Sequence, residues 1–421
     1  MPRLRRPSDR ALRLRHRAKQ ARCPGALPHL RPRHPGRLVL AVVLLQVAVS
    51  FTPAHPGFDA ATFDPIVQGG IHAGAYPGAA FVVGRRDTIL FAKGYGRLTW
   101  SPSSRAVSAE STLYDLASLT KVVATTTAAM LLVERGKLDL DAPAARYVPE
   151  FDGPGTAGIT VRQLLTHTSG LRATLPLYQE PDSAAALAAL FHVTPIVPPG
   201  TRVIYSDLNA MLSGEIVRRA AGEPLDRFAA REILAPLGMT QTTFRPRRAL
   251  YDRIAPTGVW RGTPVAGVVN DRNAARLGGV AGHAGLFAPA ADVARFAQFM
   301  LREGTLPDGR PLLGAETVRR FTARSAGPER GTGGEARALG WQALPTGEAV
   351  SSVGHLFGPR SYGHTGWTGT SLWIDPERDL FVVLLTNRAY APRARRSFTA
   401  LKQVRGRLAD AAAQASDAGA R

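Results

Sequence analysis

Apolar residues are grouped along this chain into short runs near its two ends and longer stretches between them. Short apolar runs separated by turn residues are typical of β-hairpins. Two such pairs are present: 81–84 with 88–92, and 370–375 with 380–386. We therefore expect one sheet built from two distant parts of the chain, about 60–115 and 340–400.

The stretches between these strands carry the signals of helices. Residues 119–134 are apolar nearly all round, which predicts a buried helix, and Gly136 follows as a C-terminal capping residue. A short helix is expected to begin after the N-cap Thr160 and to close at Gly170. Further helices are expected at 182–192, 207–222, 292–303 and 395–413. Strands at both ends with helices between them predict an α+β fold.

The net charge of +21 is unevenly placed along the chain. Residues 1–37 hold twelve Lys or Arg and one acidic residue, Asp9, so this leader carries +11 and the rest of the chain +10. We expect this basic, Pro-interrupted leader to be disordered, and its charge could attract nucleic acid. We assign no nucleic-acid partner, because no recognised reader motif accompanies the charge.

The leader is followed by an apolar segment of twelve residues, 38–49, which has the length of a signal-peptide core and is too short to span a bilayer comfortably. Small residues suited to cleavage follow up to Ala54. We expect export to the periplasm or the exterior, with 38–54 either removed or kept as a membrane anchor, and one domain over 55–421. Cys23 is the one cysteine and precedes this segment, so the exported domain would have no disulfide.

The first chemical signal is Ser118-x-x-Lys121, at the start of the predicted buried helix. Positions i and i+3 share a helix face, so the amine and the hydroxyl can meet. A Lys amine beside a Ser hydroxyl can help to remove its proton and make it a nucleophile. Only five of the 53 basic residues are lysines, and Arg cannot serve as a base, so a Lys at 121 fits an amine-dependent site. The alternative is a chance match, because this motif is short.

Two further motifs follow in order, Tyr205-Ser206-Asp207 and His364-Thr365-Gly366, with linking stretches at 164–171 (LLTHTSGL) and 282–287 (GHAGLF). Together these residues resemble the serine β-lactamase-like and penicillin-binding-protein superfamily, most of all its class C β-lactamase branch with the related family VIII esterases and D-aminopeptidases. The resemblance covers most of residues 60–400. It implies a β-lactamase-like fold, in which a mostly antiparallel sheet flanked by helices faces a helical subdomain.

By this resemblance Ser118 is the acylated nucleophile, at a helix N-terminus that favours developing negative charge. Lys121 is the buried amine of a network with Ser118 and Tyr205, and Tyr205 is the proton shuttle. Which of Lys121 and Tyr205 is the base in acylation stays open, since their titrations couple. The backbone N–H groups of Ser118 and Trp367 form the oxyanion hole. Taken singly, these residues could be an N-cap serine, a surface lysine and a core tyrosine.

The sequence departs from the β-lactamase pattern at two positions. His364, on the edge strand with Thr365 and Gly366 that would face the substrate, stands where β-lactamases carry Lys. A histidine is only partly charged near neutrality and suits a penicillin carboxylate less well than a permanent cation. Asp207 stands where Asn is usual, and it could keep Lys121 or His364 protonated or repel an acidic substrate. Both departures favour ester, amide or D-amino-acid peptide substrates.

Two other histidines lie in the linking stretches. His167 is expected to be a structural histidine at a helix end, whereas His283 either lines the cleft or is a solvated loop residue. The chain has no H-E-x-x-H metal motif and no G-x-S-x-G elbow. The resemblance implies no metal or organic cofactor.

The sequence therefore predicts an exported serine hydrolase that forms an acyl-enzyme with a small-molecule or peptide substrate, one that could come from the cell wall. The alternatives are a β-lactamase or DD-peptidase acting on penicillins or peptidoglycan, and a catalytically silent cell-wall ligand sensor. The intact Ser, Lys and Tyr argue against a silent binder, which has no use for a deprotonation network. The sequence motifs predict no particular oligomeric state.

Overall fold

The computed structural model describes residues 58–327, 336–344, 351–390 and 398–418. The basic leader and the segment 38–54 lie outside these ranges, so disorder, export and anchoring stay predictions. Within the described ranges, no helix combines the length and the apolar character needed to cross a membrane.

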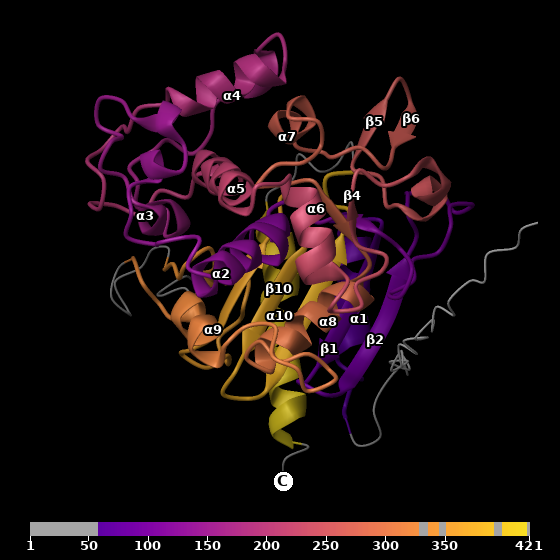
Figure 1. Ribbon diagram of the computed structural model, residues 1–421. Coiled ribbons are helices and arrows are strands. Elements are labelled where there is room, and N and C mark those ends of the chain that lie inside the picture. Colours follow the sequence, from indigo (N-terminus) through magenta and orange to yellow (C-terminus); the bar gives the residue numbers. More distant parts are fainter. Residues whose placement is uncertain (1–57, 328–335, 345–350, 391–397, 419–421) are drawn as a thin grey trace, which may run out of the picture. The chain divides into compact units, whose positions relative to one another are not determined.

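A six-stranded antiparallel sheet joins the two distant parts of the chain that the sequence analysis paired (Figure 1). Its strand order is β2-β1-β11-β10-β9-β8. The strands, in chain order, are β1 (Gly78–Gly84), β2 (Ile89–Gly96), β8 (Gln342–Ala343), β9 (Tyr362–Thr365), β10 (Ser371–Asp375) and β11 (Leu380–Thr386). Both predicted hairpins, β1–β2 and β10–β11, are confirmed.

Helices cover both faces of this sheet, which explains why its central strands are apolar without alternation. Every residue of β1 is buried. Phe81 packs on one face with α1 (Phe63–His72) and α10 (Thr399–Ala418). Its neighbour Val82 points to the other face, where α8 (Ala290–Leu301) and the helical region lie.

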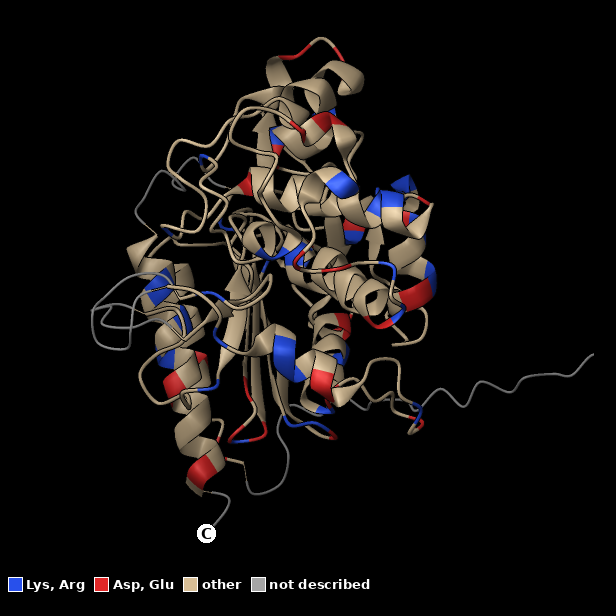
Figure 2. Cartoon of the chain, turned by 60° about the vertical axis from the view of Figure 1, so that its left-hand side comes forward, with Lys and Arg blue, Asp and Glu red and all other residues tan. Residues whose placement is uncertain are grey.

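The middle of the chain forms a helical region. Its helices are α2 (Thr127–Glu134), α3 (Val161–Leu165), α4 (Ser183–Phe191), α5 (Asp207–Ala221), α6 (Leu225–Ala229), α7 (Arg272–Arg276) and α9 (Ala315–Thr322). In the view of Figure 1, α4, α5 and α7 lie above the sheet, and α9 lies lower, beside it. Short strands accompany them: β3 (Tyr114–Asp115), β4 (Thr243–Phe244), β5 (Gly258–Trp260), β6 (Thr263–Val265) and β7 (Leu286–Ala288). Basic and acidic positions are interspersed over the described chain (Figure 2).

The prediction that the third helix closes at Gly170 is wrong. Helix α3 begins with a capping box at Thr160, as predicted, but ends at Leu165. His167 takes the left-handed conformation after the helix, with φ +59°, and the N–H of Thr168 donates to the carbonyl of Gln163. Gly170 serves a different purpose, because a Cβ there would lie 2.1 Å from the carbonyl oxygen of Val197.

The final helix runs over Thr399–Ala418 rather than 395–413, and the first residues of the predicted range lie outside the described residues. The other predicted helices are found within one or two residues of their expected bounds, which is the usual uncertainty of helix ends.

Candidate active site

Ser118 lies at the start of the long buried helix that the sequence predicts. Residues 119–120 open this helix, a π-helical stretch η1 (Lys121–Thr126) follows, and α2 completes it. π-helical turns are rare and are frequently found at functional sites. The residue before Ser118 is strained, since Ala117 has φ +47° without being a glycine. The carboxylate of Asp115 holds this conformation by accepting the N–H of Ala117 at 2.8 Å.

Two buried hydrogen bonds join the segment before Ser118 to the turn after β9. The hydroxyl of Thr368 donates to the carbonyl of Asp115 at 2.7 Å, and that of Thr370 donates to the carbonyl of Leu116 at 2.8 Å. They bring the backbone around Ser118 next to residues 364–367. The predicted oxyanion hole, formed by the N–H groups of Ser118 and Trp367, falls at this junction and stays a prediction.

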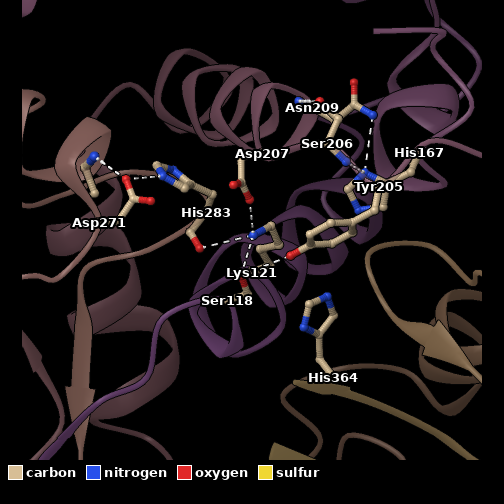
Figure 3. Close-up of polar contacts among 12 residues, drawn as sticks. Ser118, Lys121, His167, Tyr205, Ser206, Asp207, Asn209, Asp271, His283 and His364 are labelled. Atoms are coloured by element: carbon tan, nitrogen blue, oxygen red, sulfur yellow. Dashed lines mark hydrogen bonds and ion pairs between the residues drawn. The ribbon is translucent and has the colours of Figure 1, made fainter. Parts of the chain in front are cut away.

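Lys121 is buried beneath Ser118, with 3 % of its surface exposed, so the surface-lysine alternative is wrong. Its Nζ donates to Ser118 Oγ at 2.8 Å, to Asp207 Oδ1 at 2.8 Å and to the carbonyl oxygen of His283 at 3.3 Å (Figure 3). An ammonium has three N–H donors, and each one meets an acceptor here. Burial by itself would lower the pKa of Lys121, but Asp207 and Tyr205 outweigh it and leave the pKa above its ordinary value.

Tyr205 approaches Ser118 from the segment just before α5. Its hydroxyl donates to Ser118 Oγ at 3.0 Å (Figure 3). Two cations lie close to the ring, with Lys121 Nζ 5.1 Å and Arg337 Cζ 4.7 Å from its centroid. Helix α5 fixes this approach, because Ser206 caps it by accepting the N–H of Asn209.

Asp207 is paired with Lys121 rather than with His364. Burial would raise the pKa of Asp207, but the charge of Lys121 2.8 Å away lowers it below its ordinary value. This ion pair favours the protonated form of Lys121, in agreement with the expectation that Asp207 could keep Lys121 protonated. The expectation for His364 is wrong, because the pKa of His364 is lowered well below its ordinary value by burial and by the charges of Arg337 and Lys121.

His364 is thus neutral at physiological pH. Only 3 % of it is exposed. Its Nδ1 lies 2.8 Å from the carbonyl of Thr365 and donates to it, which leaves Nε2 as an acceptor with no partner among the described residues. β-Lactamases carry a Lys where this chain has His364, and the permanent positive charge near this position comes instead from Arg337. The sequence analysis missed Arg337, because it lies in the segment before β8, outside every motif.

The two histidines of the linking stretches are both buried. His167 lies two residues after the end of α3, as expected. Its Nδ1 accepts the N–H of Ser206 at 3.2 Å, and its ring packs against Tyr205. His283 lines the cleft, so the solvated-loop alternative is wrong. Its Nε2 lies 2.9 Å from Asp271 Oδ1, a residue that the sequence analysis did not single out.

These residues surround a cleft of about 760 Å³. Every predicted site residue lines it except Lys121, which lies beneath Ser118: Ser118, Tyr205, Asp207, His364, Thr365, Gly366 and Trp367. The same cleft is lined by Asp271, His283 and four cations, Arg272, Arg337, Lys402 and Arg405. Over the described ranges, no group of three or more His, Cys, Asp or Glu side chains is arranged to hold a metal ion. The arrangement fits acyl transfer to a serine.

Comparison with known families agrees with this geometry, since the beta-lactamase family model matches residues 63–405. The chain belongs to the beta-lactamase family. It is a serine hydrolase of this family, and the resemblance inferred from the sequence motifs is confirmed.

The chain is also similar to individual members. It is 36% identical over 355 residues to an Escherichia coli protein provisionally named D-alanyl-D-alanine carboxypeptidase, covering 76% of this chain and 80% of that one. A penicillin-binding-protein homologue from Caulobacter crescentus aligns with a TM-score of 0.66 at 21% identity over 86% of this chain and 99% of that one. A class C beta-lactamase mutant gives a TM-score of 0.66 at 20% identity, covering 83% and 97%. These two structures show that the fold is β-lactamase-like, as predicted.

Proposed function

We propose that this chain is a serine peptidase of the carboxypeptidase type, which hydrolyses the amide bond before a C-terminal D-amino acid through an acyl-enzyme on Ser118. The observation that carries the proposal is the pair of contacts to Ser118 Oγ, from Lys121 Nζ at 2.8 Å and from the Tyr205 hydroxyl at 3.0 Å. A serine oxygen held by an ammonium and a phenol has both a charge stabiliser and a proton-transfer group within reach.

Tyr205 is the better candidate for the base in acylation. Lys121 is held as an ammonium by Asp207, and an ammonium has no lone pair to accept a proton. The cycle begins when Tyr205 gives its phenolic proton to solvent, after which its phenolate oxygen accepts the hydrogen bond of the Ser118 hydroxyl. Ser118 Oγ then attacks the carbonyl carbon, and its proton passes to this phenolate oxygen. Lys121 and Arg337, close to the Tyr205 ring, stabilise that negative charge.

The remaining steps return every proton. The C–N bond breaks as Tyr205 gives its proton to the leaving nitrogen, so an amine departs and an ester of Ser118 remains. Water then attacks the ester carbon while one of its protons passes to Tyr205. Breaking the ester bond releases the acid, and Ser118 Oγ takes the proton back from Tyr205.

The charges in the cleft support a substrate with a carboxylate. Arg337 is buried at the cleft wall beside Tyr205 and supplies the permanent cation that His364 does not. The charge of Asp207 is compensated by Lys121 at 2.8 Å, so it does not repel an acidic group as an isolated carboxylate would. The name of the Escherichia coli relative points to the same substrate class.

Export belongs to the same proposal, because peptides with D-amino acids would be met outside the cytoplasm. It rests on the apolar segment 38–49. Sequencing the N-terminus of the protein recovered from the producing cell would distinguish removal of 38–54 from its retention as an anchor. An intact N-terminus on soluble cytoplasmic protein would count against export.

The test of the activity compares an N-acylated peptide that ends in D-Ala-D-Ala with the same peptide amidated at its C-terminus. We expect release of D-alanine from the free acid with kcat/KM at least about tenfold above that for the amide. Arg337→Ala should remove this preference. Arg302→Ala is the matched control, because Arg302 is mostly buried and pairs with Asp87 outside the cleft.

p-Nitrophenyl butyrate and nitrocefin are assayed in parallel with the peptides. Turnover of the ester without the peptide would show an esterase, and turnover of nitrocefin a β-lactamase. Peptide turnover that persists in Ser118→Ala would show that Ser118 is not the nucleophile. If the protein hydrolyses none of these compounds, the silent sensor becomes the better explanation.

A further inference from the structure

A second pair of ionisable side chains, the buried His283 and the half-buried Asp271, lies beside the catalytic network without touching Ser118 (Figure 3). Neither residue belongs to the three motifs, and the proposed acyl transfer assigns no proton to either. Both line the cleft, and His283 is only 2 % exposed. A buried imidazole with a carboxylate partner calls for a physical explanation beyond packing.

The connection to the chemistry runs through the backbone of His283. Two of the three acceptors of Lys121 are side chains, whereas the third is the carbonyl oxygen of His283, 3.3 Å from Nζ. A backbone acceptor can orient an ammonium only if the loop that carries it is fixed. The loop here is 279–285, which has glycines with positive φ at both ends, Gly279 and Gly285.

Two sets of contacts fix this loop. On one side, Gly282 packs directly on α5, where a Cβ would lie 2.0 Å from the carbonyl oxygen of Ala210, and its own carbonyl accepts the hydroxyl of Thr125 at 2.7 Å. On the other side, the side chain of His283 is held by the 2.9 Å bond from its Nε2 to Asp271, and its Nδ1 has no hydrogen-bond partner among the described residues.

Asp271 is itself held in place. Its Oδ1 also accepts the N–H of Ala274 at 2.8 Å, as the N-cap of α7. Burial would raise the pKa of Asp271, but the hydrogen bond and charge of His283 and the N–H of Ala274 lower it to about 2. It is therefore a carboxylate at any working pH and a strong acceptor for the imidazole N–H.

We propose that Asp271 and His283 form a positioning pair, which holds the 279–285 loop so that the carbonyl of His283 keeps the Lys121 ammonium aimed at Ser118. The pair acts through Lys121 and touches neither substrate nor the reacting atoms. This inference rests on the proposed function, because it takes Ser118 as the nucleophile.

The test measures how fast a fluorophosphonate labels Ser118 in the full-length chain, since this reagent forms an Oγ–P bond with release of fluoride. Asp271→Ala and His283→Ala should label about 10- to 100-fold more slowly, the cost of a misplaced catalytic group. Asp271→Asn keeps an oxygen that can accept both N–H groups, so it should stay within about threefold of the native rate. His283→Gln keeps an N–H donor for Asp271, so it should also stay near the native rate. Compared with His283→Ala, it tests the pair from the other side if Asp271→Ala does not fold.

The matched control is Asp292→Ala. Asp292 is a buried carboxylate that accepts the N–H of Gln241 and the hydroxyl of Thr242 and does not line the cleft. It should lose thermal stability yet label at the native rate.

Native-rate labelling of both Asp271→Ala and His283→Ala would overturn the inference while the proposed function stands. Equal slowing of Asp271→Asn and Asp271→Ala would also overturn it, because the charge rather than the held position would then matter. If the native chain is not labelled, or Ser118→Ala is labelled equally, the proposed function fails and takes this inference with it.

Discussion

Lys121 could act as an ammonium that stabilises negative charge or as a free amine that takes the proton of Ser118. Replacing Asp207 by Asn distinguishes these two roles more cleanly than any other single change. The substitution keeps an oxygen that can accept from Lys121 Nζ, and it removes the one charge that Asp207 places 2.8 Å away. Asn is the residue that the resemblance leads us to expect at this position, so the variant should fold. Only the protonation of Lys121 and the field at Ser118 should change.

The size of the effect follows from the distance. Two unit charges 2.8 Å apart interact by about 6 kcal/mol at an effective dielectric constant of about 20. Even half of this exceeds the ~1.4 kcal/mol that shifts a protonation equilibrium tenfold. Asp207 raises the pKa of Lys121, so removing its charge must lower that pKa. Lys121 then loses its proton at a lower pH than in the native protein.

We expect Asp207→Asn to keep its activity near pH 6 and to lose it on the alkaline side, because the ammonium that stabilises the Tyr205 phenolate is lost there. The alkaline limb of the kcat profile should move down by at least about one pH unit. The assay is kcat for the D-Ala-D-Ala peptide, measured between about pH 5 and 10. Asp292→Asn, the same change in a buried carboxylate outside the cleft, should leave the profile unmoved.

The opposite result would refute the reasoning. If Lys121 is the base as a free amine, lowering its pKa supplies more of the active form at neutral pH. The variant would then show a higher kcat at pH 7 and an acid limb moved to lower pH. Tyr205 would no longer be needed as the proton acceptor in acylation.

Three further predictions follow from particular contacts. Ser118→Ala should lower turnover by about 10⁴-fold or more while the thermal unfolding midpoint stays near the native one, because the change removes only the nucleophile; comparable residual turnover would contradict its role. Gly282→Ala should cost about 1–3 kcal/mol of unfolding free energy in urea, because its Cβ would lie 2.0 Å from the carbonyl oxygen of Ala210, and an unchanged midpoint would show that the loop can yield. Asp271 has a pKa lowered to about 2, so its stabilising contribution is present above the unfolded value near 3.8 and is lost as the pH falls toward 2. Asp271→Asn should therefore lose less unfolding free energy than the native protein between those pH values. Urea titrations that give the same loss for both proteins would contradict this.

The fold was accessible from the sequence where the deciding interactions are local or periodic. Apolar runs with turn residues between them predicted the β1–β2 and β10–β11 hairpins, and the capping box at Thr160 marked the start of α3. The end of α3 was not accessible in the same way. His167 supplies the left-handed residue there, whereas Gly170 is kept by a close approach of Val197, a contact between distant positions that no local pattern carries.

The same distinction between local and distant interactions holds for the site. The contact between Ser118 and Lys121 could be predicted from their spacing, because one helical turn brings positions i and i+3 together. The state of each group, by contrast, depends on neighbours from other elements. Asp207 holds Lys121 as an ammonium, and Arg337, Lys121 and burial together keep His364 neutral.

The sequence by itself thus determined the family, the order of the strands and helices, and the residues that could carry acyl transfer, since these follow from periodicity and short motifs. Only the tertiary structure decided which charges meet. Arg337 and Asp271 lie in segments without a motif and reach the cleft through the folding of distant parts of the chain. Protonation depends on burial and on charges within a few ångströms, and neither of these is written in the order of residues along the chain.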